Sequence, residues 1–120
     1  MSIGLLLSDD LIFTSRVTGT ARDLGLSFRV AKTTAALLAL AREQPPACVI
    51  VDLASPGMNI ADFVTELKRL TLPPRIVAYG SHVDTATLKA ARAAGCDLVM
   101  PRSQFVEELP KSLPAWMAGT

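Results

Sequence analysis

The sequence predicts an α/β fold: a three-layer α/β/α sandwich built on a five-stranded parallel sheet. Two observations carry this prediction. Short apolar runs alternate five times with longer segments of helical spacing, and successive strand–helix–strand crossovers are right-handed and cover both faces of a parallel sheet with helices. The chain has 120 residues, about the length of one domain. It shows no linker, repeat or low-complexity stretch, so we expect a single domain over residues 1–120.

The expected strands are short and apolar on both faces, as strands covered from both sides of a parallel sheet must be. Each is bounded by Asp, Gly, Pro or Ser. They cover Ile3–Leu7, a weaker run at Ser27–Ala31, and residues 48–51, 76–79 and 98–100.

Helices are expected between these strands because apolar residues recur there at spacings of three and four. The clearest stripes are Phe13, Val17, Ala21 and Leu24, and then Ile60, Phe63, Val64, Leu67 and Leu70; weaker ones are Leu37, Leu38 and Ala41, and Leu88, Ala91 and Ala94. Thr33 and Asp84 are suitable N-caps. Gly25 and Gly95 lie just past two helices, where a positive φ is favourable.

The last helical segment carries two prolines. Ser103 is positioned to cap a helix that includes Leu109, but Pro110 and Pro114 follow. A proline inside a helix removes a hydrogen bond and clashes with the preceding turn, at a cost of about 3 kcal/mol. We therefore expect the C-terminal helix to be broken into short pieces.

Composition excludes several classes of protein. Twelve basic and eleven acidic residues give a net charge of +1, so no overall field attracts nucleic acid or an anionic membrane. No apolar run approaches the roughly 20 residues of a spanning helix, and the N-terminus lacks the basic region of a signal peptide. Cys48 and Cys96 are expected to be small buried residues of a reducing compartment. These features predict a cytoplasmic domain that binds neither nucleic acid nor membrane.

Carboxylates follow two of the expected strands. Asp9 and Asp10 come after the first, and Asp52 ends the third. Because ligands gather at the carboxyl ends of parallel strands, the three carboxylates would meet there if these strands are neighbours. Such a cluster must raise its pKa values or recruit a cation. Hard oxygen ligands suit Mg²⁺ best, with Mn²⁺ as the other cation they accept.

The same residues allow plainer interpretations. An Asp-Asp pair after a strand caps the following helix and complements its dipole. A single Asp such as Asp52 also commonly opens a loop. The expected convergence of all three carboxylates at one edge favours the metal site.

Three segments give the chain a resemblance to a known family. They are Leu-Ser-Asp-Asp at 7–10, Val-Ile-Val-Asp-Leu-Ala-Ser-Pro-Gly-Met at 49–58, and Ala-Ala-Gly-Cys-Asp at 93–97. With them the chain resembles the CheY-like receiver domains of two-component response regulators, as an atypical member. The resemblance extends over almost the whole length and implies a flavodoxin-like sheet with strand order 2-1-3-4-5.

The resemblance also implies a function. Asp52 would accept a phosphoryl group from a histidine kinase, a phosphotransfer protein or a small phosphodonor. Asp9, Asp10, Asp52 and the backbone carbonyl of Ala54 would hold Mg²⁺. The domain would not be an enzyme beyond phosphorylating and dephosphorylating itself, and it would switch a downstream protein or a fused output domain, or form a homodimer.

Two positions depart from the family pattern. Receivers carry Thr or Ser at the end of the fourth strand, but the corresponding residue here is Gly80, with Ser81 one step later. They also carry a Lys before a Pro at the end of the fifth strand. Counting from that proline gives Met100, whereas counting from Gly95 gives Arg102. Ser81 would supply the hydroxyl if the loop shifts, which Gly80 allows, and Arg102 would bind a phosphoryl group where Met100 cannot. The alternatives are that Ser81 only forms a turn and that Arg102 is an ordinary surface cation.

These departures leave three hypotheses open. The first is a phosphorylatable receiver, with Tyr79 and His82 near its output surface. The second is a pseudo-receiver of the same fold that binds a protein partner without phosphate chemistry, as the missing hydroxyl and displaced cation suggest. The third is an unrelated small α/β enzyme that uses the three carboxylates with a metal ion.

Overall fold

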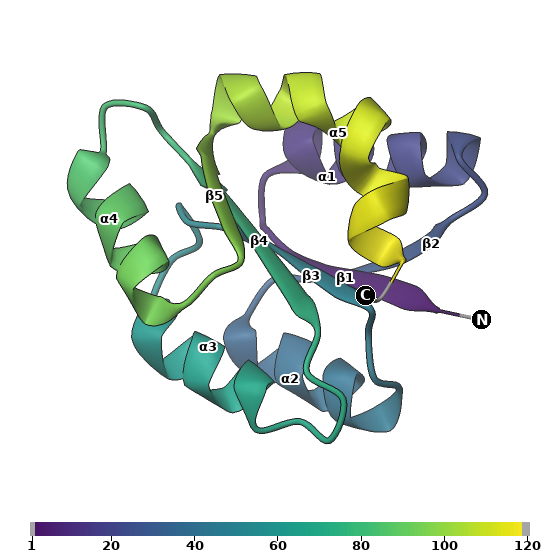
Figure 1. Cartoon of the computed structure of the whole chain (residues 1–120), viewed down its shortest axis with the longest axis horizontal. Helices are drawn as coiled ribbons and strands as arrows, with labels where there is room; N and C mark the ends of the chain where they lie inside the picture. Colours follow the sequence, from purple (N-terminus) through teal and green to yellow (C-terminus); the bar gives the residue numbers. More distant parts are fainter. Residues whose placement is uncertain (1, 119–120) are drawn as a thin grey trace.

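The computed structural model describes residues 2–118, and within them five strands alternate with five helices (Figure 1). The elements are β1 (Ile3–Leu7), α1 (Leu11–Asp23), β2 (Ser27–Ala31), α2 (Thr34–Glu43), β3 (Cys48–Asp52), α3 (Ile60–Lys68), β4 (Arg75–Gly80), α4 (Thr85–Ala94), β5 (Leu98–Pro101) and α5 (Arg102–Met117).

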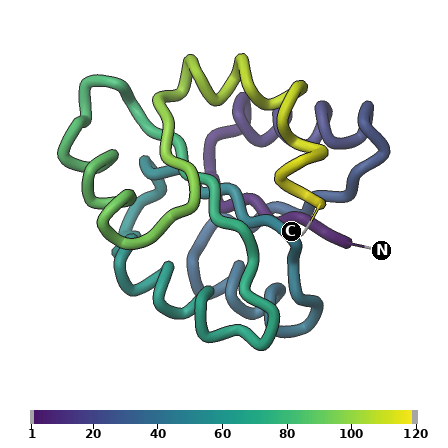
Figure 2. The backbone as a smooth tube through the Cα atoms, viewed as in Figure 1, coloured from purple at the N-terminus to yellow at the C-terminus, as the bar shows by residue number. Residues whose placement is uncertain are grey.

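All strand pairs are parallel, and the sheet has the order β2-β1-β3-β4-β5. The fold class and strand order predicted from the sequence are confirmed. Figure 1 shows α1 and α5 on one face of the sheet and α2, α3 and α4 on the other. The backbone trace in Figure 2 follows these helical crossovers on the two faces of the sheet, and after each one the next strand runs parallel to the others.

Each face of the sheet has its own apolar core, because successive side chains of a strand point to opposite faces. On the α1/α5 face lie Leu6, Cys48, Ile50, Val77, Tyr79 and Met100 from the strands and Val17, Ala21, Phe105, Leu109, Leu113 and Trp116 from the helices. The other face buries Leu5, Leu7, Val49, Val51, Ile76 and Ala78 against α2, α3 and α4.

Several expected helix ends are confirmed. Thr33 accepts a hydrogen bond from the backbone N–H of Ala36 and caps α2, and Asp84 does the same for Thr87 and caps α4. Gly95 follows α4 with φ +100°. At that positive φ a side chain is strained, so glycine is favoured there.

The C-terminal helix differs from the prediction. It runs from Arg102 to Met117 without interruption, and Pro101 rather than Ser103 occupies the N-cap. Pro110 and Pro114 both lie on the exposed side, where carbonyls without an amide partner can be hydrated. Instead of breaking, the helix bends along its length (Figure 1), as helices do at proline.

Packing explains why this helix persists. Phe105, Leu109, Leu113, Trp116 and Met117 form a continuous buried stripe against the sheet. Burial of large apolar side chains contributes about 1.5–3 kcal/mol each, which outweighs the proline penalty on the opposite side. The expectation of short pieces was wrong because it considered local propensity alone.

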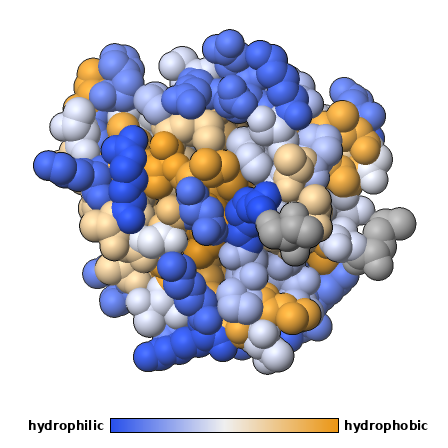
Figure 3. All heavy atoms as spheres, viewed as in Figure 1, coloured by the Kyte–Doolittle hydropathy of each residue, from blue (hydrophilic) through white to orange (hydrophobic). Residues whose placement is uncertain are grey.

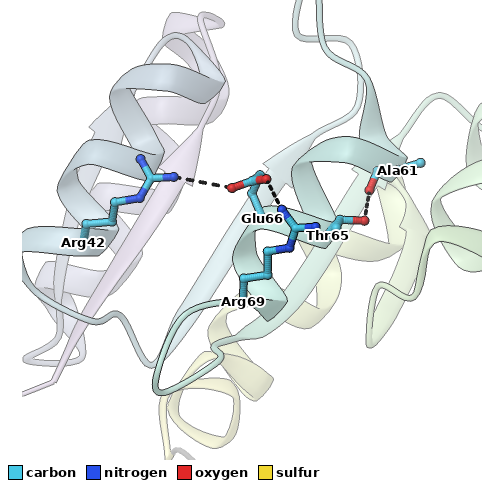
Figure 4. A network of polar contacts seen from close by, with 5 residues as sticks. All are labelled: Arg42, Ala61, Thr65, Glu66 and Arg69. Atoms are coloured by element: carbon cyan, nitrogen blue, oxygen red, sulfur yellow. Dashed lines mark hydrogen bonds and ion pairs between the residues drawn. The ribbon is translucent and has the colours of Figure 1, made fainter.

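On the other face of the sheet, ion pairs connect α2 and α3. Glu66 of α3 bonds to Arg69 one turn later at 3.0 Å and to Arg42 of α2 at 3.5 Å (Figure 4). The two arginine side chains are largely exposed and that of Glu66 is half-buried, so the network adds modestly to the apolar contact beneath it. Separately, none of the helices between residues 2 and 118 is long and apolar enough to cross a membrane.

Candidate functional site

Asp52 ends β3, the central strand of the sheet, at the edge where the carboxyl ends of all five strands gather. Its residue is only 3% exposed. A carboxylate at this depth needs hydrogen-bond donors or a cation, because burial penalises an unpaired charge. Among the described residues 2–118, no Lys or Arg forms an ion pair with Asp52, and two hydrogen-bond donors contact it instead.

Two donors hold the Asp52 carboxylate. The hydroxyl of Ser8 donates to Oδ2 at 2.8 Å, and the backbone N–H of Ala54 donates to Oδ1 at 2.9 Å. Ser8 follows β1 directly, is fully buried, and also accepts a hydrogen bond from the backbone N–H of Asp10 at 3.1 Å. The end of β1, the end of β3 and the loop after β3 are thereby tied together at one carboxylate.

The acidic pair after β1 divides between two environments. Asp10 is the N-cap of α1, and its Oδ1 accepts from the backbone N–H groups of Ile12 and Phe13 at 2.9 and 3.2 Å. Asp9 is exposed. The plainer interpretation, in which the pair caps the next helix, is therefore confirmed for Asp10.

The expected cluster of three carboxylates does not form. Within residues 2–118, no group of three or more His, Cys, Asp or Glu side chains is arranged to hold a metal ion. Asp10 caps the N-terminus of α1 instead, and the residue that contacts Asp52 is Ser8, through its hydroxyl. The backbone carbonyl of Ala54 lies in the turn after β3, and its predicted role as a metal ligand stays a prediction.

The ends of β4 and β5 form a small hollow beside this loop. Its volume is about 50 Å³, and its lining includes Ala54, Gly80, Ser81 and Arg102. The structure thus brings Gly80, Ser81 and Arg102 together next to the residue that holds Asp52. Ser81 also forms a turn, since its hydroxyl accepts from the backbone N–H of Val83 at 3.4 Å. Both interpretations of Ser81 therefore remain compatible with its position.

Two of the expected site residues lie elsewhere. Met100 is 4% exposed and belongs to the apolar core beneath α1 and α5, so it does not contact this hollow. Tyr79 is fully buried and is not on the output surface. Both residues point to the α1/α5 face because of strand alternation. His82 is exposed, as expected.

Tyr79 lies next to Asp52 on the neighbouring strand β4, on the α1/α5 face of the sheet. It is paired with Asp52 in the β3–β4 register. Its ring stacks between Phe13, with centroids 5.0 Å apart, and Phe105, at 4.4 Å. Burial raises the pKa of Tyr79 above its usual range, the charge of Asp52 raises it further, and the Ser8 hydroxyl opposes this effect. The Tyr79 hydroxyl has no hydrogen-bond partner among the described residues.

Sequence reasoning overlooked Ser8. Ser8 is part of the segment at 7–10 that carries the resemblance, but only the neighbouring Asp9 and Asp10 were assigned a function there. The available signal was a hydroxyl residue directly after a fully apolar strand, which must hydrogen-bond if the strand end is buried.

A curated relative supports the resemblance. The chain is 29% identical over 105 residues to a response regulator receiver protein of Anaeromyxobacter sp., and the match covers 88% of this chain and 44% of that protein. The chain thus spans less than half the length of the curated relative that it matches. No family model matches the chain.

Solved structures show the same fold. The receiver domain of NtrX from Brucella abortus superposes with a TM-score of 0.82 at 18% identity, covering 99% of this chain and 100% of that one. CheY4 of Vibrio cholerae gives 0.80 at 21% identity, over 97% and 98%. The receiver domain of Ssk1 from Saccharomyces cerevisiae, crystallised with the histidine phosphotransfer protein Ypd1, gives 0.79 at 18% identity, over 97% and 88%. Strand order, these structures and the curated relative confirm that the chain resembles the receiver domains of response regulators and has their fold.

Proposed function

We propose that this domain is a signal receiver in which Asp52 accepts a phosphoryl group in a Mg²⁺-dependent two-component phosphorelay. The observation that carries the proposal is the Asp52 carboxylate, held at the carboxyl end of the central strand by Ser8 and the Ala54 amide. A carboxylate in this position can act as a nucleophile toward phosphorus. Its two hydrogen bonds fix its orientation before the donor arrives, which lowers the entropic cost of attack.

The chemistry is a single displacement. One oxygen of Asp52 forms an O–P bond while the P–N bond of a phosphohistidine, or the P–O bond of a small phosphodonor, breaks. The bonding electron pair leaves with the donor, and the product is an acyl phosphate on Asp52. In such transfers, positioning and electrostatic stabilisation supply most of the catalysis.

The cation proposed for this site would keep much of its water, because the carboxylates of the described residues are not gathered into a ready metal site. Mg²⁺ is commonly bound through only one or two carboxylates together with phosphate oxygens and waters. Asp9 and Asp52 would supply carboxylate oxygens, Asp10 would contribute the oxygen that does not cap α1, and the Ala54 carbonyl would complete the protein ligands. When bound, the ion would neutralise charge on the transferring phosphoryl group.

Arg102 and Ser81 are our candidates for sensing the phosphoryl group. Both line the hollow next to Ala54. Arg would bind phosphate oxygens through its planar fork, whereas Lys would act as a point charge. A phosphoryl group that draws these residues inward would shift the β4–α4 and β5–α5 loops, which is a common way to switch a partner surface.

Apolar side chains near this edge favour a protein as the phosphodonor. Leu11 and Ile12 open α1 and are 75% and 73% exposed. We propose that they contact a histidine kinase or phosphotransfer protein. Apolar atoms also gather over β5 between α4 and α5 (Figure 3), where Leu98 is 39% exposed. We propose this face for a downstream protein, a fused output domain or a second copy of the chain.

Two contacts of the site favour a second candidate function, a pseudo-receiver. Ser8 contacts Asp52 where a carboxylate was expected, and Asp10 is engaged as a helix cap. Both features suit a pseudo-receiver, a protein-interaction domain without phosphate chemistry.

The two functions separate in one experiment. The protein and its Asp52→Asn variant are incubated with acetyl phosphate and Mg²⁺ and weighed by intact-mass spectrometry. The receiver predicts an added phosphoryl group on the parent alone, and none when EDTA replaces Mg²⁺. Beryllofluoride, a stable phosphoryl mimic, covers the case of a short-lived adduct. A folded protein that neither gains mass nor binds beryllofluoride would establish the pseudo-receiver instead.

A further inference from the structure

Buried polar atoms without a partner gather around Asp52. Among the described residues 2–118, two buried side-chain oxygens lack a hydrogen bond, the hydroxyls of Ser55 and Tyr79. Ser55 lies three residues after Asp52 and uses its backbone N–H to bond the Asp52 carbonyl at 3.0 Å. Tyr79 lies opposite Asp52 in the neighbouring strand. An unpartnered buried hydroxyl costs free energy, so its retention at this place requires a reason.

The Tyr79 hydroxyl cannot find water by moving. The residue is fully buried, and its ring is held between Phe13 and Phe105 at centroid distances of 5.0 and 4.4 Å. Phe105 in turn stacks on Trp116 at 6.1 Å. A ring clamped in this way holds its hydroxyl in one place.

That place is beside the acceptor carboxylate. Tyr79 is the register partner of Asp52, and because Asp52 follows Ile50 by two residues in β3, its side chain leaves the strand on the same α1/α5 face as Ile50 and Tyr79. Ser8 is already committed, because it donates to Asp52 and accepts from the Asp10 amide. Among the described residues, Tyr79 and Ser55 thus have buried hydroxyls without a partner, and that of Tyr79 is held in place by the aromatic rings on either side of it.

We propose that Tyr79 is a positioning residue whose hydroxyl donates a hydrogen bond to the phosphorylated Asp52 side chain, in place of the hydroxyl that receivers carry at the Gly80 position. This inference rests on the proposed function. A phosphoryl group adds negatively charged oxygens to the carboxylate, and hydrogen bonds to charged acceptors are about twice as strong as neutral ones. The hydroxyl is unpartnered before phosphorylation and acquires an acceptor after it.

The aromatic stack would transmit the formation of this Tyr79 hydrogen bond to α5. Tyr79 links Asp52 to Phe105, which belongs to the first turn of α5, and through it to Trp116 near the end of that helix. A small movement of the phenol toward the phosphoryl group would be passed to the packing of α5. The receiver would then report phosphorylation through the α1/α5 face as well as through the β4–α4 loop.

The test measures beryllofluoride binding in the presence of Mg²⁺ for the parent, Tyr79→Phe and the control Phe13→Leu, which disturbs the same stack and keeps the hydroxyl. We expect Tyr79→Phe to bind about tenfold more weakly, the effect of losing one charge-assisted hydrogen bond, and Phe13→Leu to change by no more than about twofold. Without beryllofluoride, Tyr79→Phe should be at least as stable as the parent, because it lacks the unpartnered hydroxyl.

A second measurement does not depend on a variant. Tyr79 is the single tyrosine of the chain, so protein labelled with ¹³Cζ-tyrosine gives one ring-carbon resonance at the hydroxyl. We expect that resonance to shift when beryllofluoride binds. A parent that binds while the resonance stays fixed and Tyr79→Phe binds equally well would overturn this inference and leave the proposed function intact. A parent that neither binds beryllofluoride nor accepts phosphate would overturn both.

Discussion

The hydroxyl of Ser8 donates a 2.8 Å hydrogen bond to Oδ2 of Asp52, joining two residues that lie 44 positions apart in the chain. The bond connects the ends of the adjacent strands β1 and β3. Together with the Ala54 amide, it gives the buried Asp52 carboxyl group a hydrogen-bond donor at each oxygen. This arrangement gives the first of five predictions.

Replacing Ser8 by Ala should lower the free energy of unfolding by about 1.5–3 kcal/mol, since a hydrogen bond to a buried charged group is lost. The measurement is urea denaturation at neutral pH. Ser15→Ala is the matched control, because Ser15 is exposed on α1, and it should change stability by less than about 0.5 kcal/mol. Equal effects from both variants would show that the Ser8 hydroxyl contributes no stability.

Replacing Pro110 by Ala should stabilise the protein by roughly 1 kcal/mol. The new amide can bond within the helix, which recovers part of the ~3 kcal/mol proline penalty, while the unfolded chain gains entropy. Trp116 is the single tryptophan and is buried on α5, so its fluorescence reports on docking during denaturation. A loss of stability with a red-shifted Trp116 spectrum would mean that the bend itself is required for packing.

The pKa of Asp84 is held below its usual range by hydrogen bonds from Thr87. A carboxyl whose folded pKa is lowered stabilises the protein above its unfolded pKa, and this contribution is lost as pH falls through the folded value. Asp84→Asn should therefore lower the thermal midpoint at pH 7 and approach the parent's midpoint as the solution becomes more acidic. Glu43→Gln, at an exposed position, controls for the loss of one charge. A deficit that stays constant down to pH 2 would contradict the charged-cap explanation.

Burial raises the pKa of the Cys48 thiol to about 12 and that of the Cys96 thiol to about 11. Alkylation proceeds through the thiolate, so native protein at pH 8 should react slowly with iodoacetamide, and Cys48 more slowly than Cys96. In denaturant both should react rapidly. Cys96→Ser isolates the Cys48 signal in mass spectrometry. Fast alkylation of Cys48 in the native state would indicate that the α1/α5 core opens readily.

Replacing Glu66 by Gln should cost less than about 1 kcal/mol, because exposed ion pairs contribute little. Glu66 joins Arg42 and Arg69 on the surface of α2 and α3 (Figure 4). The effect should shrink further in 1 M NaCl, where charges are screened. Leu67→Ala on the buried side of the same helix is the comparison, with an expected cost of about 2–5 kcal/mol. A larger loss from Glu66→Gln than from Leu67→Ala would contradict this.

Much of the fold could be predicted because the apolar periodicity is strong. Strands such as Ile3–Leu7 are buried at every position, and a run that is apolar on both faces has few other structures available. The C-terminal helix was predicted less well. Its stability depends on contacts between Phe105 or Trp116 and the sheet, and no local propensity includes those contacts.

The site was predicted in part for a related reason. Position along the chain indicated that Asp9, Asp10 and Asp52 follow strands that end at one edge. It did not indicate which side chains meet there. Asp10 caps α1, whereas Ser8 contacts Asp52. Which of the two side chains contacts Asp52 depends on how the backbone is oriented after β1. Tyr79 was expected on the surface, yet strand alternation turns it into the core beside the site.

The sequence by itself determined the alternation of strands and helices and the placement of Asp52 at the end of a buried strand, because hydrophobic periodicity and strand-end polarity are local properties. Only the tertiary structure decided that Ser8 holds Asp52, that Tyr79 keeps an unpartnered hydroxyl beside it, and that α5 survives two prolines. Those outcomes depend on contacts between residues distant in the chain, whose energies exceed the local preferences that the sequence displays.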